Sequence, residues 1–411
     1  MATIKPFKSI RPRVDLVDRI AALPYDVYNR KEALLEVQKE SLSFLKIDRA
    51  ETQFDESVDT YASCVYEKAK EILDGMIVDG SFVEEETAAY YIYELTMNGR
   101  IQTGIAACAS IDDYQNNIIK KHENTREDKE IDRISHVDTC SAQTGPIFLA
   151  YRSSQMINEV VDAVKKETPL YDFTASDGVR HTVWIIKDEA EIAKIEQGFG
   201  QTESIYIADG HHRAASAVKV GLKRRQEVKN YTGDEEFNYF LSVLFPHDQL
   251  MIMDYNRVVC DLAGYNKEEY LAKAAEKFLV EKIGNKPYKP EEKGTIGMYL
   301  DHTWYKISIK SEYKKQDPVE GLDVSILQNE LLGPVLNIGD PRTDKRIDFI
   351  GGIRGIEELE KRVDDDMAVA FAMYPTSIIE LFDVSDAGKL MPPKSTWFEP
   401  KLRSGIFIHR I

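Results

Sequence analysis

The residues best placed to do chemistry follow a short apolar run that reads as a buried strand. There the sequence continues Asp209-Gly210-His211-His212-Arg213, and residues at helical spacing come next. A helix that begins at His211 or His212 points its unpaired N–H groups and its positive dipole end beyond the strand. Gly210 permits a turn that a Cβ would obstruct, and Arg213 can grip a phosphate with two parallel N–H groups. The segment therefore predicts an anion-binding cradle. The alternative is that Asp209 caps the helix and both histidines are ordinary surface residues.

A second polar segment, residues 121–133, combines a carboxylate with several cations. It reads KHENTREDKEIDR, so that Glu123 stands between Lys121 and Arg126. A carboxylate can act as a general base, and neighbouring cations can hold phosphate. The alternative is a solvated helix face, because the charges alternate in sign. If phosphoryl transfer takes place here, Glu123 is the first candidate for the base that deprotonates a substrate hydroxyl, with Asp209 as its competitor and as a Mg²⁺ ligand.

Two further segments offer substrate-binding candidates. In LPYDV, Tyr25 precedes Asp26, which is either the cap of a turn into the next helix or a carboxylate of the pocket. Near the C-terminus, residues 394–396 resemble the end of a phosphate-binding loop but lack its glycines, so a P-loop is rejected. The Pro-rich, basic tail can instead fold back and supply Lys394 or Lys401 to an anion. The alternative is a clamp that packs the aromatic side chains of the tail into the core.

Composition limits the classes of function. The chain has 411 residues, of which 43% are hydrophobic and 30% charged, so it is long enough for two or three globular domains. Fifty-three Lys and Arg against seventy Asp and Glu give a net charge of −17, which disfavours nucleic acid and anionic membranes as partners. A small anionic substrate is not excluded, because a pocket gathers its own cations. The sequence leaves a homodimer open.

The sequence also points to a compartment. Its first residues lack the apolar core of a secretory signal, and no run of about 18 apolar residues occurs. The four cysteines form no C-x-x-C pair, so neither a zinc knuckle nor a disulfide framework is indicated. We expect a cytoplasmic protein with reduced thiols.

The elements that must position these residues alternate between helix and strand, which predicts a mixed α/β or α+β fold. Asn98-Gly99 and Asp301-His302 each join two apolar runs, as in β-hairpins. Residues 265–281 have a helical pattern, and residues 282–294 are the best linker candidate, with two prolines and two glycines. From this linker we expect two domains, which are an α/β domain over residues 1–284 and an α+β domain over residues 285–411 whose tail returns to the first.

Several long motifs carry a resemblance to a known family. They are PYDV, KHENTREDKEIDR, ADGHHR, DPRTD and PPKSTWFEPKLRSGIF. Through them the whole chain resembles the family of domains of unknown function numbered 1015. The ADGHHR loop also resembles the phosphate-binding loop of the ParB and sulfiredoxin superfamily, which includes kinases of free serine and DNA-partitioning CTPases. The catalytic cysteine of sulfiredoxin has no counterpart here, because His211 or its neighbour stands in that loop.

The second resemblance implies a fold of that type for the first domain and a nucleotide-phosphate site in the loop. We therefore expect an enzyme that transfers phosphate from ATP or ADP, with Mg²⁺, to a small hydroxyl compound, with free serine as the favoured guess. The alternatives are a nucleotide-binding regulator of ParB type and a metal-assisted hydrolase that uses the histidine pair. The expected site comprises catalytic Glu123, Asp209 and His212; nucleotide-binding Gly210, His211, His212, Arg213, Arg126 and Lys121; substrate-binding Tyr25, Asp26 and Lys394; and Asp209 as metal ligand.

Overall fold

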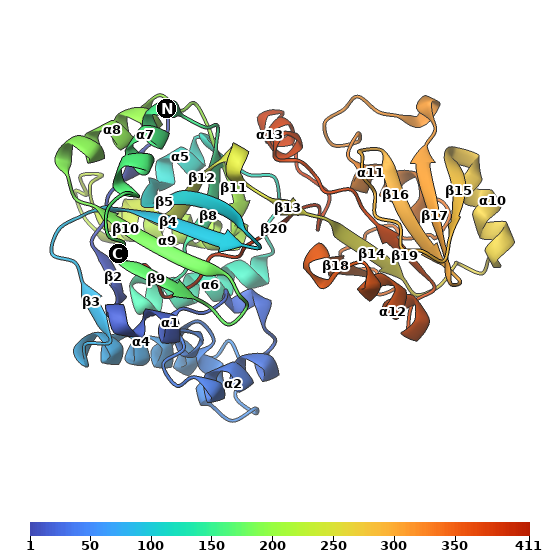
Figure 1. The fold of residues 1–411 in the computed structure, drawn as a ribbon. Coiled ribbons are helices and arrows are strands. Elements are labelled where there is room, and N and C mark those ends of the chain that lie inside the picture. The colour runs from blue at the N-terminus through green and yellow to red at the C-terminus, as the bar shows by residue number, and fades with distance from the viewer. The chain divides into compact units, whose positions relative to one another are not determined.

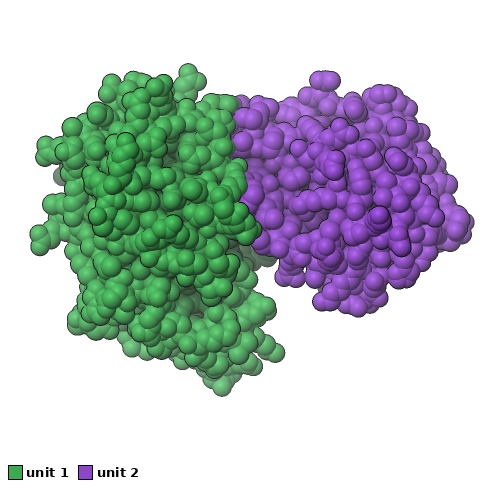
Figure 2. Space-filling view, in the orientation of Figure 1, with its two compact units in different colours: residues 1–250, 400–411 green, residues 251–399 purple.

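The computed structural model describes residues 1–411 and confirms a mixed α/β fold (Figure 1). The chain forms two compact units, residues 1–250 together with 400–411, and residues 251–399 (Figure 2). The boundary expected after residue 284 lies inside the second unit, at the last residue of a strand. The last twelve residues belong to the first unit, so both ends of the sequence build it.

A nine-stranded mixed sheet is the centre of the first unit. Eight strands run in the order β6-β11-β8-β12-β5-β4-β10-β9, and β1 pairs with β5 off this path. The pairs β6–β11 and β8–β12 are parallel, and the others are antiparallel. The strands are β1 (Ile4–Lys5), β4 (Tyr90–Met97), β5 (Arg100–Ser110), β6 (Ile119–Lys120), β8 (Ile147–Tyr151), β9 (Tyr171–Thr174), β10 (Arg180–Ile186), β11 (Ile205–Asp209) and β12 (Tyr239–Pro246).

The two faces of this sheet are covered by different parts of the chain. In β4, Tyr90 and Ile92 face a core that includes apolar side chains of α7, α8 and α9. Because side chains alternate along a strand, Tyr91 and Tyr93 point to the other face, where both rings contact Phe407 of the C-terminal segment. The helices of this unit are α1 (Val17–Ile20), α2 (Arg30–Lys39), α3 (Leu45–Asp48), α4 (Ser63–Val78), α5 (Ile111–Gln115), α6 (Glu127–Cys140), α7 (Gln155–Val164), α8 (Glu189–Gly200) and α9 (His211–Glu227).

A second core lies under a small sheet with the order β3-β2-β21-β7. Its strands are β2 (Ser9–Pro12), β3 (Phe82–Glu84), β7 (Ala142–Gln143) and β21 (Ile408–Arg410). The apolar faces of α2, α3 and α4 pack in this core. Because β21 lies between β2 and β7, the end of the chain is fixed as an inner strand of the sheet.

The second unit has its own six-stranded sheet, in the order β15-β17-β16-β19-β14-β18, and its own apolar core. The strands are β14 (Tyr255–Val259), β15 (Phe278–Gly284), β16 (Thr295–Leu300), β17 (Thr303–Ile309), β18 (Ile347–Gly351) and β19 (Val369–Ala372), with a separate pair β13 (Ile252–Met253) and β20 (Trp397–Phe398). The helices are α10 (Lys267–Lys277), α11 (Asp323–Leu327), α12 (Glu357–Asp365) and α13 (Ile378–Asp386). None of the helices in either unit combines the length and apolarity that a membrane span needs.

Of the elements predicted from local sequence, the two hairpins are confirmed and one helix is only partly correct. Both hairpins are confirmed, with turns at Asn98-Gly99 and Asp301-His302. The helix expected over residues 265–281 is wrong after Lys277, because the chain turns into β15 and Phe278 pairs with Ile309. A periodic helical pattern cannot reveal that its last turn has a better partner in a distant strand.

Candidate functional site

Two polar loops of the first unit lie side by side because the strands before them are parallel neighbours. β6 pairs with β11, with Ile119 opposite Ile205. Parallel strands end at the same edge of a sheet, so the loop after Lys120 and the turn after Asp209 leave the sheet together. The pairing thereby brings the two most polar motifs of the sequence into one place.

The turn after β11 has the left-handed glycine that the predicted cradle requires. Gly210 is the cap of α9 and has a φ of 93°, in the left-handed region. A Cβ on Gly210 would lie 3.1 Å from the guanidinium of Arg213, so both conformation and space favour glycine. The N-cap residue of α9 is Gly210 and not Asp209, so the interpretation of Asp209 as the cap is wrong.

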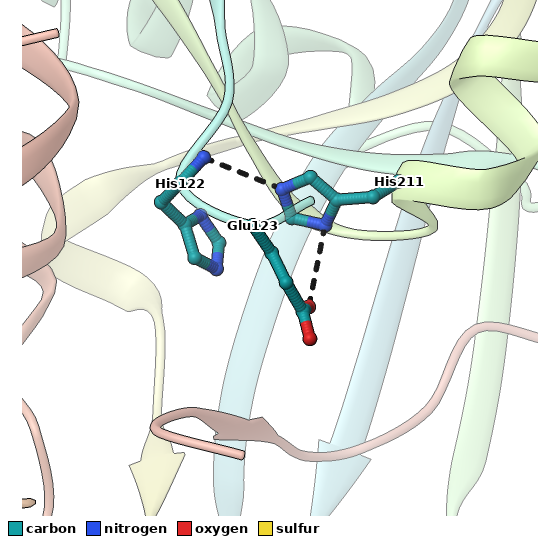
Figure 3. Close-up of side chains that lie close together, drawn as sticks. All are labelled: His122, Glu123 and His211. Atoms are coloured by element: carbon teal, nitrogen blue, oxygen red, sulfur yellow. Dashed lines mark hydrogen bonds and ion pairs between the residues drawn. The ribbon is translucent and has the colours of Figure 1, made fainter. Parts of the chain in front are cut away.

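The histidines of the cradle face the other loop. The Nε2 of His211 lies 3.5 Å from the backbone nitrogen of His122, and its Nδ1 lies 3.9 Å from Oε2 of Glu123 (Figure 3). The backbone N–H of Arg126 donates to Nε2 of His212 at 3.0 Å. His211 is buried and His212 half-buried, so they are not the surface residues of the alternative interpretation.

Burial keeps these imidazoles neutral at pH 7. It lowers the pKa of His122 to about 4. It also lowers the pKa of His211 well below 6.5, with a further contribution from His122, and it lowers the pKa of His212. Neutral imidazoles can accept a proton or bind a metal ion.

Asp209 is held as a carboxylate by the cations around it. Its Oδ2 lies 3.0 Å from Nζ of Lys401, and its Oδ1 accepts the N–H of Gly210 at 2.8 Å. Burial alone would raise its pKa, but Lys401 and Arg213 outweigh burial and hold the pKa well below its ordinary value. The C-terminal segment thus delivers a lysine to the cradle.

A pocket lies beside Arg213. Its wall includes two guanidinium groups, those of Arg133 and Arg213, and the buried carboxylate of Asp48. Arg213 also donates to the carbonyl of Pro146, which fixes its side chain between cradle and pocket. The remaining lining residues are Tyr25, His136, Val137, Gln143, Thr144, Gly145, Ile147, Ala217, Leu241 and Ser404.

The polar groups of this pocket are held in place by their neighbours. Arg133 lies 4.1 Å from the ring centre of Tyr25 and pairs with Asp132 at 2.9 Å. Thr144 donates to Oδ1 of Asp48 at 2.8 Å. Burial raises the pKa of Tyr25 to about 12, so its hydroxyl stays protonated. Such a pocket can bind a small molecule that carries both a negative and a positive charge.

The structure places the predicted residues unevenly. Tyr25 lines the pocket, while Asp26 is exposed in a short helical turn. The N-cap residue of α2 is Asn29, so the interpretation of Asp26 as the cap is wrong. Arg126 and Lys121 are exposed at the loop surface. Lys394 belongs to the second unit, where Nη2 of Arg257 donates to its carbonyl at 3.0 Å.

The interpretation of residues 121–133 as a solvated helix face fails for the helical part. In α6, one side of the helix is buried, and its buried polar members are Glu130, Asp132, Arg133 and His136. Sequence reasoning missed Asp48 and Thr144 altogether, because each is a single polar residue in an otherwise ordinary segment. Only the buried contact between them reveals their place in the pocket.

Several solved structures are distantly similar to the chain. Free serine kinase in complex with AMP is 14% identical, with 74% of this chain and 91% of that chain covered and a TM-score of 0.36. C-terminally truncated SbnI from Staphylococcus aureus is 12% identical, with 72% and 82% covered and a TM-score of 0.38. A conserved hypothetical protein from Pyrococcus furiosus is 14% identical, with 74% and 94% covered and a TM-score of 0.34. At these TM-scores the likeness carries no inference about function.

No curated protein matches the sequence significantly. A family profile does match, from β1 to the middle of α11, and this range includes both polar loops of the cradle. Over residues 4–325 the chain belongs to the family described as protein of unknown function DUF1015.

Proposed function

We propose that the first unit transfers a phosphate from ATP or ADP to a small hydroxyl compound, with free serine as the favoured acceptor. The observation that supports this proposal is the meeting of Glu123 with the cradle of α9, next to a pocket lined by two arginines. A phosphotransferase needs little more than a phosphate grip, a base and a way to position the acceptor.

The nucleotide phosphates would bind at the start of α9. The backbone N–H groups after Gly210 point at this position, and Arg213 stands beside it. Lys401, Lys121 and Arg126 add positive charge that a phosphate chain can recruit, with Lys401 exchanging Asp209 for a phosphate oxygen.

The acceptor would lie in the pocket, with its carboxylate on Arg133 and its ammonium near Asp48. Its hydroxyl would then face the cradle past Arg213. Glu123, or Asp209 as its competitor, would take the hydroxyl proton while the hydroxyl oxygen bonds to the terminal phosphorus. The bond from that phosphorus to the bridging oxygen breaks, which leaves ADP from ATP or AMP from ADP. His212, neutral and half-buried, would orient the loop through the N–H of Arg126.

Mg²⁺ fits this donor set, because it prefers carboxylate and phosphate oxygens. Asp209 is the carboxylate that would hold it together with the nucleotide. When bound, the ion supplies neutralisation of the phosphate charge.

The reactants are soluble metabolites, so we propose the cytoplasm as the compartment. The likeness of the ADGHHR loop to the ParB and sulfiredoxin superfamily remains part of the same proposal.

Thermal unfolding with ATP, ADP or CTP and Mg²⁺ tests the nucleotide part. A nucleotide that binds only the folded state raises the unfolding temperature of the wild type but not of Arg213→Ala. Arg180→Ala is a matched control, because Arg180 is an exposed residue of the same unit that pairs with Asp172. Equal shifts in all three proteins, or none in the wild type, would refute the cradle.

Phosphate transfer to serine should then vanish in Glu123→Gln while the nucleotide-induced shift persists.

A further inference from the structure

Three potential metal ligands meet between the two loops of the cradle. His122 and Glu123 come from the loop after β6, and His211 is the first residue of α9. One ligand atom from each of the three lies within 4.8 Å of the others. Figure 3 shows the three side chains gathered at one point between the loop and the helix.

The buried imidazole of His122 has an unsatisfied polar atom. It is 2% exposed, and its Nδ1 has no hydrogen-bond partner. Buried polar atoms without a partner are rare, and each calls for an explanation such as a bound ion. The rings of His122 and His211 stand edge to face with centres 4.5 Å apart, so no other side chain separates them.

We propose that His122, Glu123 and His211 bind one divalent transition metal ion, for which Zn²⁺ is the probe. Two imidazoles and one carboxylate suit zinc or iron rather than magnesium or calcium, which prefer oxygen ligands throughout. This site goes beyond the proposed phosphotransfer and does not depend on it.

The three ligand atoms, which lie within 4.8 Å of one another, must move closer together to hold one ion. Two ligands of one tetrahedral Zn²⁺, each at about 2.1 Å, lie about 3.4 Å apart. Nδ1 of His211 and Oε2 of Glu123 are 3.9 Å apart, and the Glu123 side chain is 44% exposed, so rotation of that side chain closes the gap. The contact from the His122 amide to Nε2 of His211, at 3.5 Å, is at the outer limit of a hydrogen bond. Because an ion at Nδ1 leaves the ring proton on Nε2, this weak hydrogen bond must be given up when the ion binds.

The buried state of the two imidazoles favours the same ion. Metal ions bind the neutral form of histidine, so protons compete weakly at a buried ring. Because Glu123 is also the proposed base, an ion in this site and proton transfer by Glu123 exclude each other. Zn²⁺ binding and nucleotide binding are measured separately, so failure of either proposal leaves the other intact.

The test is direct metal binding by the full chain without an affinity tag. Protein purified without chelator is analysed for metal content, stripped with a chelator, and titrated calorimetrically with Zn²⁺ alone. We expect one equivalent to bind, and at least tenfold weaker binding in His122→Ala and Glu123→Gln. His302→Ala is the matched control, because this exposed histidine of the second unit pairs with Asp364 instead, and its affinity should stay within about threefold.

Glu123→Gln keeps the test decisive if His122→Ala does not fold, because Glu123 lies at the surface of the loop. Co²⁺ in place of Zn²⁺ should give visible absorption bands in the wild type that both variants lose. Less than a tenth of an equivalent of Zn²⁺ at saturation, or equal affinity in wild type and Glu123→Gln, would overturn the proposal.

Discussion

Replacement of Gly210 by alanine isolates what the cradle requires of its turn. A non-glycine residue in the left-handed region costs about 1–2 kcal/mol, and Gly210 has a φ of 93°. The new Cβ would also lie 3.1 Å from the guanidinium of Arg213, which must move. Arg213 donates to the carbonyl of Pro146, and loss of such a charged hydrogen bond costs about 1.5–3 kcal/mol. We expect the free energy of unfolding to fall by about 2.5–5 kcal/mol if the hydrogen bond is lost completely.

Gly99 is the matched control for the backbone term. It lies in the hairpin turn between β4 and β5 with a φ of 78°, and a Cβ there would meet no atom within 4 Å. Gly99→Ala should therefore cost only the conformational part, about 1–2 kcal/mol. In the double variant Gly210→Ala with Arg213→Ala, the second substitution removes the clash, so the added cost of Gly210→Ala should shrink to the same value.

Urea unfolding at pH 7 measures these differences, and nucleotide-induced thermal shifts measure the cradle. Gly210→Ala should lose the shift that Gly99→Ala retains. If Gly210→Ala destabilises no more than Gly99→Ala, the close approach of Arg213 is not a constraint. If it also keeps the full nucleotide shift, the assignment of the phosphate site to this turn is wrong.

Three further predictions concern charge and exposure in the same molecule. Lys401→Ala should raise the pKa of Asp209 and lower the free energy of unfolding, measured in urea at pH 7, by about 1–2 kcal/mol, which is less than for a fully buried pair. Lys401→Arg should restore the wild-type stability. Equal stability of the wild type and both variants would contradict the ion pair. The pKa of His122 is about 4 in the folded state against 6.5 in the unfolded state, so the unfolded state binds a proton first as the pH falls. Between pH 6.5 and 4, this residue should therefore lower the free energy of unfolding by about 1.4 kcal/mol per pH unit. Urea unfolding at several pH values should show a shallower slope in His122→Gln, and an unchanged slope would argue against the buried neutral ring. A thiol reagent should modify only the exposed Cys64 and Cys260 in the native protein, and all four cysteines after unfolding. More than two modified thiols in the native protein would contradict the burial of Cys108 and Cys140.

Local patterns in the sequence were enough for elements whose interactions are close along the chain. The Asn98-Gly99 turn supports positive φ at both residues, and the structure has this conformation. The strand, turn and helix around Gly210 were predictable for the same reason, because glycine conformation and helix start are set by a few neighbouring residues. The resemblance to the 1015 family also came from contiguous motifs, and the family match bears it out over residues 4–325.

Patterns failed where the deciding partner was distant. The helical spacing through residue 281 did not reveal the pairing of Phe278 with Ile309, nor did the proline-rich stretch at 282–294 mark the division of the chain. Asp48 and Thr144 carried no local signal, because a buried polar pair is defined by the two residues together.

The chemical groups of the site, and the backbone turn that presents them, can be identified from local sequence. Which of these groups lie next to one another depends on the packing of the whole unit. Parallel pairing of β6 with β11 sets Glu123 beside His211, and the return of the C-terminal strand sets Lys401 beside Asp209. The physical reason is that residue type and local conformation depend on short-range sterics and hydrogen bonds, whereas strand partners are chosen by burial over the whole core.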